Sequence, residues 1–238
     1  LYTSRADGDG VAAWRRHNAD LKSRCEYLNA LGLRRLHYKA SNGTDFTVGL
    51  IPEAQFLAGA ETTLGTGVVF NPNIPSEEVF TSPMKGDAEG IVYSTRPLSF
   101  RGTMIENFSV CFKNGRVCEV HAEKGEEALK TMVSMDEGAG MLGECALVPY
   151  DSPIRSSGIM FYNTLFDENA ACHLALGDGF ANCIRDYDKY TFEQCREMGI
   201  NMSMIHEDFM IGSKDLDITG ITENGETVQI FRNGNWAF

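Results

Sequence analysis

Three of the four Asn-Gly dipeptides in this chain constrain its fold most strongly, because each of these three lies between two runs of strand-forming residues. They are Asn42-Gly43, Asn114-Gly115 and Asn224-Gly225. Asn-Gly favours a two-residue turn whose backbone twist matches that of two paired antiparallel strands. We therefore expect hairpins with arms at 36–39 and 45–51, at 108–112 and 117–122, and in the two halves of 218–231.

Helical spacing is less frequent than strand-like spacing. Apolar residues recur at three- and four-residue steps over 11–31, which is typical of an amphipathic helix. We expect further helices over 126–135, 167–176 and 191–198, the last with Thr191 as its N-cap. Additional short strands are expected at 67–70, 90–94 and 146–149. No repeat or long linker interrupts 1–238, so we predict one α+β domain with a mixed or antiparallel sheet and flanking helices.

Charge and cysteine content narrow the classes of function. The formal net charge of −12 disfavours binding to nucleic acid or to an anionic membrane, because both attract Lys and Arg. No run of 18 apolar residues is present, so we expect no membrane span. The seven cysteines are odd in number and include no Cys-x-x-Cys pair. We interpret them as reduced, mostly buried thiols of a cytoplasmic protein.

Four short segments of the sequence carry side chains that can bind a metal ion. The first two carry carboxylates only. Glu77 and Glu78 are adjacent in a proline-bounded loop, and neighbours in an extended backbone point to opposite sides, so only one of them can enter a given site. A solvated turn is the simpler interpretation. Glu144 opens an apolar run after Gly143, which permits a close backbone approach. A salt bridge to Lys or Arg would equally satisfy this carboxylate.

The other two segments each combine an imidazole with a carboxylate. Glu168 and His173 are about 140° apart around the axis of the expected helix, so they would reach one ion only at a helix end. A histidine hydrogen-bonded within the core is the alternative. His206 and Asp208 are two residues apart and share a face in an extended backbone, where they either form a structural hydrogen bond or bind a cation.

Together these segments supply oxygen and nitrogen ligands without a thiolate. Such a set suits one or two divalent ions, such as Zn²⁺, Co²⁺ or Mn²⁺. Two cations repel each other, and a carboxylate-rich site with one bridging carboxylate offsets that repulsion. The six candidate ligands are Glu78, Glu144, Glu168, His173, His206 and Asp208.

The same segments, in this order, resemble the thermophilic-type metallo-aminopeptidases. The similarity is carried by 73–83, 142–149, 166–177 and 205–212, and it continues through Asn42-Gly43-Thr44-Asp45, Pro97-Leu98-Ser99 and the ending Gly234-Asn235-Trp236-Ala237. This resemblance implies a two-metal site that removes single residues from the N-termini of peptides. It also implies Glu78 rather than Glu77 as the ligand and Glu144 as the bridging carboxylate.

The two-metal mechanism also needs a proton acceptor, and the sequence departs from the family in two respects. Glu77 is the expected catalytic proton acceptor, with Glu207 as the other candidate. Members of the family are longer, with an N-terminal domain that this sequence does not include, and the full-length protein is expected to form a homodimer. They also carry a tyrosine shortly after the ligand histidine, where this chain has Phe180, and if that hydroxyl stabilises the oxyanion, Phe180 cannot do so.

Two other functions stay open at this point. A non-catalytic fragment of such an enzyme would bind metal for folding and hydrolyse nothing. A cysteine hydrolase would use Cys172 or Cys145 with a histidine, and thiol reagents rather than chelators would inhibit it.

Overall fold

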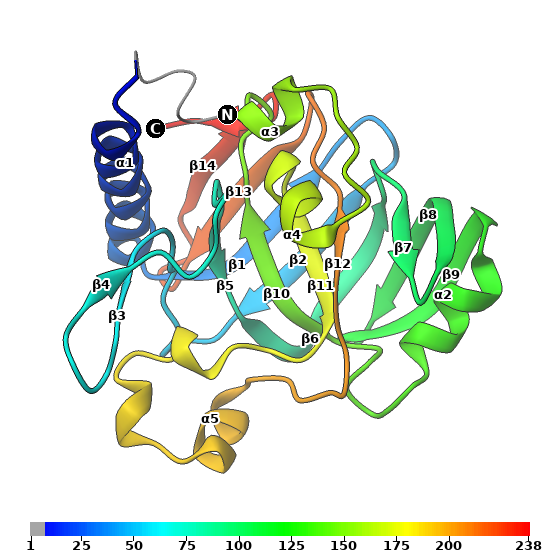
Figure 1. Cartoon of the computed structure of the whole chain (residues 1–238). Coiled ribbons are helices and arrows are strands. Elements are labelled where there is room, and N and C mark those ends of the chain that lie inside the picture. Colours follow the sequence, from blue (N-terminus) through cyan, green and yellow to red (C-terminus); the bar gives the residue numbers. More distant parts are fainter. Residues whose placement is uncertain (1–7) are drawn as a thin grey trace.

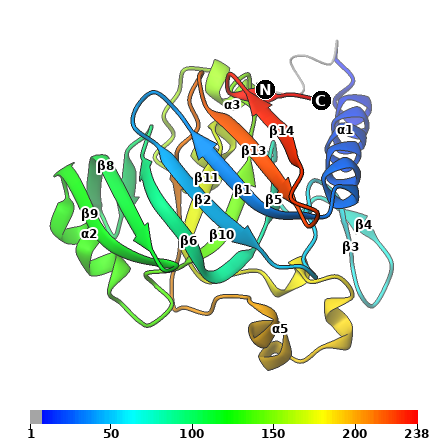
Figure 2. The ribbon, with the colours of Figure 1, turned by 180° about the vertical axis from the view of Figure 1, so that it is seen from behind.

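A computed structural model describes residues 8–238, and two antiparallel sheets form its centre. The larger sheet has nine strands in the order β15-β14-β13-β1-β2-β6-β8-β7, with β9 paired to β8. Figure 2 shows this sheet from behind. Its strands are β1 (Leu33–Lys39), β2 (Asp45–Leu50), β6 (Pro83–Tyr93), β7 (Leu98–Phe100), β8 (Thr103–Lys113), β9 (Arg116–Lys124), β13 (Asp217–Thr222), β14 (Thr227–Arg232) and β15 (Asn235–Trp236).

The smaller sheet has four strands in the order β12-β11-β10-β5 and lies in front of the larger one in Figure 1. Its strands are β5 (Val79–Thr81), β10 (Leu142–Leu147), β11 (His173–Gly177) and β12 (His206–Met210). A separate two-stranded arm, β3 (Glu61–Thr62) with β4 (Val69–Phe70), projects from the same side as β5.

Helices cover the edges of the sheets. The first, α1 (Gly10–Ala30), lies beside the β14 edge of the larger sheet in both views, and Arg24 stacks over Trp236 at 4.8 Å. In the described part of the chain, no helix is long and apolar enough to cross a membrane. The remaining helical elements are α2 (Glu126–Val133), α3 (Pro153–Ser156), α4 (Thr164–Asp167), η2 (Glu168–Ala170), η3 (Ala181–Cys183), η4 (Tyr187–Lys189) and α5 (Phe192–Met198).

The structure confirms the α+β class and the hairpins at the Asn-Gly turns. Asn114 and Gly115 join β8 to β9 with φ values of 52° and 74°, the positive pair that this tight turn requires. Thr191 caps α5 and accepts a hydrogen bond from the Gln194 backbone, as expected. All pairs within the sheets are antiparallel, so the mixed alternative does not apply.

The expected helix over 167–176 is wrong. Only the short 3₁₀ turn η2 follows α4, and His173 then begins strand β11. Every residue of β11 is buried because the strand lies between β10 and β12. A strand buried on both faces has no polar alternation, so its sequence cannot be distinguished by period from a buried helix. Placing His173 on a strand changes how it reaches the other ligands.

The apolar core lies between the two sheets and gives the smaller sheet two unlike faces. Cys145 of β10, Leu174 of β11 and Phe209 of β12 point into this core, where Phe209 packs against Phe108 of β8 with ring centroids 5.9 Å apart. Side chains alternate along a strand. The neighbours of these residues therefore point to the opposite face, away from the larger sheet.

Candidate metal centre

Three strands of the smaller sheet bring candidate ligands together on this outer face. Glu144 of β10 and Asp208 of β12 both pair with Ala175 of β11, one from each side, so they lie in one row across the sheet. The small Ala175 side chain leaves space between the two carboxylates. His206 lies on the same face as Asp208, two residues earlier on β12, as expected from the sequence.

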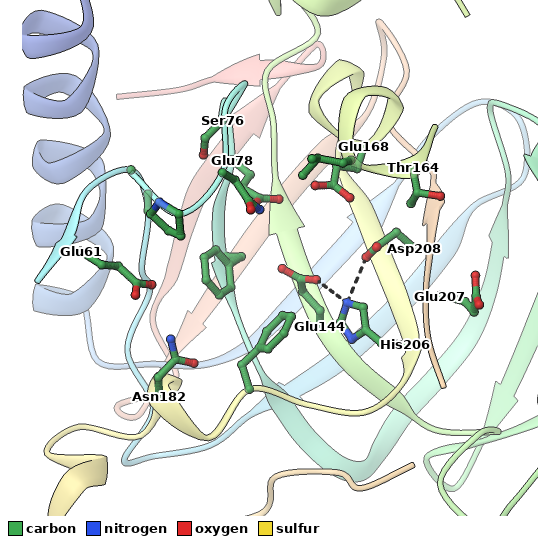
Figure 3. Close-up of a pocket in the computed structure, with 17 residues that line it drawn as sticks. Glu61, Ser76, Glu78, Glu144, Thr164, Glu168, Asn182, His206, Glu207 and Asp208 are labelled. Carbon is green, nitrogen blue, oxygen red and sulfur yellow. Dashed lines mark ion pairs between the residues drawn. The ribbon is translucent and has the colours of Figure 1, made fainter. Parts of the chain in front are cut away.

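Two further carboxylates enter from segments outside these strands. Glu78 immediately precedes β5, and Glu168 lies in η2 above β10 in Figure 3. His173, at the start of β11, points toward Glu78 with 3.1 Å between its Nε2 and Glu78 Oε2. The expected geometry of Glu168 and His173 on one helix does not occur, yet a turn followed by a strand still brings both residues to the site.

The donor atoms form two groups of three that share one residue. Glu78, Glu144 and His173 form the first group, and Glu144, His206 and Asp208 form the second, each with its ligand atoms within 4.8 Å of one another. His206 Nε2 lies 3.2 Å from Glu144 Oε2 and 3.4 Å from Asp208 Oδ1. Glu144 is the residue that the two groups share, and within residues 8–238 it does not form the salt bridge to Lys or Arg that was considered for it.

Backbone carbonyls fix both imidazoles in the same tautomer. His173 Nδ1 donates to the Ala171 carbonyl at 3.1 Å, and His206 Nδ1 donates to the Asp178 carbonyl at 2.7 Å. Since a carbonyl only accepts, Nδ1 carries a proton in each ring, and Nε2, which faces the carboxylates, is the atom that would bind a metal ion. Gly143 makes the second contact possible, because a Cβ there would lie 2.0 Å from the Asp178 oxygen.

The electrostatics of the cluster favour the binding of a cation. Four carboxylates that are at least nine-tenths buried face two imidazoles, and no Lys or Arg lines their cavity. Burial raises the pKa of Glu144 to about 7 and that of Glu168 to about 9. Burial lowers the pKa of His206, but hydrogen bonds to Asp208 and Glu144 outweigh it and raise this pKa to about 11. Buried charges need opposite charges, so the metal-free cluster holds protons in their place.

One buried atom within the described residues points directly to a missing partner. Asp208 Oδ1 is inaccessible, and its contact with His206 Nε2, at 3.4 Å, is at most a weak hydrogen bond. A buried carboxylate oxygen without a good hydrogen bond is unfavourable by about 1–3 kcal/mol or more. Oxygen and nitrogen donors converging around such an atom fit one or two divalent cations.

The cluster forms one wall of a cavity of about 400 Å³. In Figure 3, Glu61 and Asn182 lie on one side of the cluster, and Thr164 and Glu207 lie on the other. Phe180 also lines the cavity, and its ring packs against the His206 ring with centroids 4.7 Å apart. Phe180 carries no hydroxyl, so it gives this wall an apolar ring.

Glu77 points away from the cluster. Glu77 is not among the residues that line the cavity, and its Oε2 lies 3.9 Å from His17 Nε2 of α1. This is the side opposite to Glu78, as expected for neighbours in an extended backbone. The catalytic role of Glu77 stays a prediction, and this orientation does not favour it, whereas Glu207 does line the cavity.

Sequence reasoning missed several residues around the ligands. Glu61, Thr164 and Asn182 line the cavity but have no recognisable spacing relative to the ligands. The Asp178 carbonyl was missed as well, although the surrounding Gly177 and Gly179 were a local signal. Gly177 has a φ of 105°, and a Cβ there would lie 2.0 Å from the Ile205 carbonyl oxygen.

Comparison with known proteins agrees with this chemistry. Residues 1–236 match the family described as thermophilic metalloprotease (M29). The chain is 50% identical over 228 residues to Aminopeptidase AmpS of Bacillus subtilis (strain 168), covering 96% of this chain and 55% of that protein. It is 44% identical over 238 residues to Aminopeptidase T of Thermus thermophilus, covering 100% of this chain and 57% of that protein. The chain thus spans little more than half the length of these relatives.

Solved structures show the same fold. Wild-type AmpT from Thermus thermophilus superposes with a TM-score of 0.88 at 43% identity, covering 96% of this chain and 56% of that one. A 2,5-dihydroxypyridine dioxygenase from Pseudomonas putida KT2440 superposes with a TM-score of 0.59 at 17% identity, covering 92% and 59%, which shows a shared fold alone. Because its residues 1–236 match the family as a whole, this chain belongs to the thermophilic metalloprotease (M29) family.

Proposed function

We propose that this chain forms the metal-binding catalytic part of an aminopeptidase, which hydrolyses N-terminal residues from peptides. The observation that carries the proposal is the pair of ligand groups that share Glu144. One shared carboxylate between two groups is what a pair of neighbouring cations needs. The names of the relatives, which are aminopeptidases, support the substrate class.

We assign Glu78 and His173 to one divalent ion, His206 and Asp208 to a second, and Glu144 to both, with Zn²⁺, Co²⁺ or Mn²⁺ as the candidate metals. Glu168 is the sixth ligand of the proposal, because its carboxylate lines the same cavity. When bound, such ions supply a nucleophilic water near neutral pH and polarise the scissile carbonyl.

The residues of the chain itself bind and orient the substrate. An acidic cavity attracts the cationic α-ammonium group of a peptide, which supports cleavage at the N-terminus rather than inside the chain. The Phe80 and Phe180 rings pack together at 5.6 Å and provide an apolar wall beside His206. Glu207 lines the cavity and is our candidate to accept a proton from water.

Cysteine catalysis receives no support from the structure. Cys172 is buried, exchanges hydrogen bonds with the Val148 backbone, and has a pKa raised by burial to about 12. Burial raises the pKa of Cys145 further. Both thiols are therefore protonated at neutral pH and are poor nucleophiles. All seven cysteines are free, which supports a reducing, cytoplasmic location.

The direct test compares substrates with free and blocked N-termini. We expect aminoacyl p-nitroanilides to be hydrolysed after addition of Zn²⁺, Co²⁺ or Mn²⁺, and their N-acetylated forms to remain intact. Cleavage of the acetylated forms would contradict exopeptidase action. Ion binding without any hydrolysis would instead support the non-catalytic fragment, a specific alternative because the chain spans 55% of AmpS. Light scattering on the full-length protein tests the proposed homodimer.

A further inference from the structure

Asn169 makes buried hydrogen bonds that no ligand role explains. It follows Glu168 in η2, and the residue is 0% exposed. Its side-chain Oδ1 accepts a hydrogen bond from the Glu77 backbone N–H at 2.6 Å. Its Nδ2 donates to the Leu165 carbonyl at 2.9 Å. The first bond joins segments 92 residues apart in sequence, and the second fixes the side chain to its own turn.

A third buried contact extends this link to β10. Ser152 Oγ donates to the Asn169 carbonyl at 2.5 Å and accepts from the Ile154 N–H at 3.1 Å, at the N-terminus of α3. Ser152 lies shortly after β10, the strand that carries Glu144. Asn169 therefore contacts the segment before β5, the turn that carries Glu168, and the chain leaving β10.

We propose that Asn169 is a positioning residue that holds the Glu78 and Glu168 carboxylates at the separation required for metal binding. This inference rests on the proposed function. Its physical basis is the mutual repulsion of the carboxylates, which favours movement of the two ligand-bearing segments away from each other. A buried hydrogen bond between these segments opposes that movement and remains when no cation is present.

Asparagine is suited to this position because it offers both an acceptor and a donor. An aspartate would accept from the Glu77 N–H but could not donate to Leu165 when ionised. An alanine would leave the buried Glu77 N–H without a partner. Partners outside the metal's own ligands orient those ligands, and their removal typically weakens metal binding by about 10–100-fold.

A matched control separates positioning from simple stabilisation. Asn29 makes the same two kinds of bond, accepting from the Phe56 N–H at 2.7 Å and donating to the Phe56 carbonyl at 3.0 Å, between α1 and a segment that holds no candidate ligand. Asn29→Ala and Asn169→Ala should both lower the melting temperature. Only Asn169→Ala should weaken Zn²⁺ binding, by about 10–100-fold, in a competition titration against a chromophoric chelator.

A double-mutant cycle shows whether Asn169 acts through the ligand. We expect Asn169→Ala to weaken Zn²⁺ binding much less in a Glu78→Gln background than in the unmutated chain. Equal losses in both backgrounds, or equal losses for Asn169→Ala and Asn29→Ala, would overturn the inference. If Asn169→Ala does not fold, Asn169→Asp retains the acceptor and should bind Zn²⁺ more tightly than Asn169→Leu, and equal binding of those two would overturn it. Failure of the unmutated chain to bind Zn²⁺ would overturn the proposed function instead.

Discussion

The β8–β9 hairpin and the smaller sheet use charge in opposite ways. The hairpin has an exposed outer surface, and its Lys124–Glu106 ion pair has side chains 62% and 38% exposed. In the smaller sheet, the His173–Glu78 pair has side chains 1% and 7% exposed. Exposed pairs contribute about 0–1 kcal/mol, whereas buried charges are unfavourable unless they are fully compensated. Thus the charges of the hairpin are solvated, and the smaller sheet retains buried carboxylates whose excess negative charge a bound cation would compensate.

This comparison separates two kinds of substitution. Changes in the larger sheet should lower the free energy of unfolding and leave ion binding intact. Changes on the outer face of the smaller sheet should alter ion binding first. The following predictions test that separation, beginning with the largest expected effect.

Removal of metal should abolish hydrolysis and make the stability of the protein depend on pH through its buried titratable groups. In the metal-free protein, raised pKa values of Glu168 (about 9) and His206 (about 11) mean that the folded state holds more protons than the unfolded chain. Its stability should therefore fall as the pH rises from about 6 to about 8.5, and bound Zn²⁺ should reduce that fall. Melting temperatures with and without a chelator at both pH values provide the measurement. If the chelator changed the melting temperature by the same amount at both pH values, this prediction would be wrong.

Adjacent Glu77 and Glu78 should respond very differently to the same substitution. Glu78→Gln removes a carboxylate that lies 3.1 Å from His173 and should reduce Zn²⁺ affinity and kcat by more than about 100-fold. Glu77→Gln changes a side chain that faces α1 and should leave the number of bound ions unchanged. The number of Zn²⁺ ions bound per chain and kcat, measured for both variants, test this difference. An equal loss of kcat in Glu77→Gln would restore its predicted catalytic role.

Phe112→Ala tests the opposite region. Phe112 of β8 is 1% exposed and packs on Phe46 with ring centroids 5.3 Å apart. Its truncation should lower the free energy of unfolding by ~3–5 kcal/mol, measured by urea denaturation. Zn²⁺ affinity at low temperature, where the variant is folded, should equal that of the unmutated chain. A parallel loss of affinity would show that the two sheets are not separable.

Gly115→Ala should produce a smaller loss of stability. The residue has a φ of 74°, and a Cβ would lie 1.9 Å from the Gly86 carbonyl carbon, so both turns must shift. We expect about 1–2 kcal/mol of destabilisation from the left-handed backbone, with unchanged kcat. Denaturation together with the peptidase assay measures both quantities. A drop in kcat would contradict the separation.

Phe180→Tyr should have the smallest effect and the opposite sign. It places a hydroxyl in the cavity beside His206, at the position where the family resemblance predicts a tyrosine. Loss of one preorganised oxyanion donor typically lowers kcat by about 10²–10³-fold. Because this cavity is not preorganised around a hydroxyl, we expect a gain in kcat of about fivefold with little change in KM. Unchanged kcat would show that another group stabilises the oxyanion.

The same contrast explains what the sequence could predict. Hairpins of the larger sheet follow from local Asn-Gly turns and alternation, and they were predicted. The helix over 167–176 was wrong because burial of β11 is a tertiary effect, although the run Ala171 to Leu176 ending at Gly177 has the length of a buried strand. Candidate ligands came from residue type and order, whereas the Asn169 link depends on a contact between segments 92 residues apart, which no local pattern encodes.

An anomalous-scattering map of crystals soaked in Zn²⁺ would show whether Glu144 bridges two cations. We expect two peaks, one beside Glu78 and His173 and one beside His206 and Asp208, with Glu144 between them. In Glu144→Gln crystals, occupancy of both peaks should fall together. Two peaks of undiminished occupancy in that variant, or no peak in the unmutated protein, would contradict the proposed bridging role.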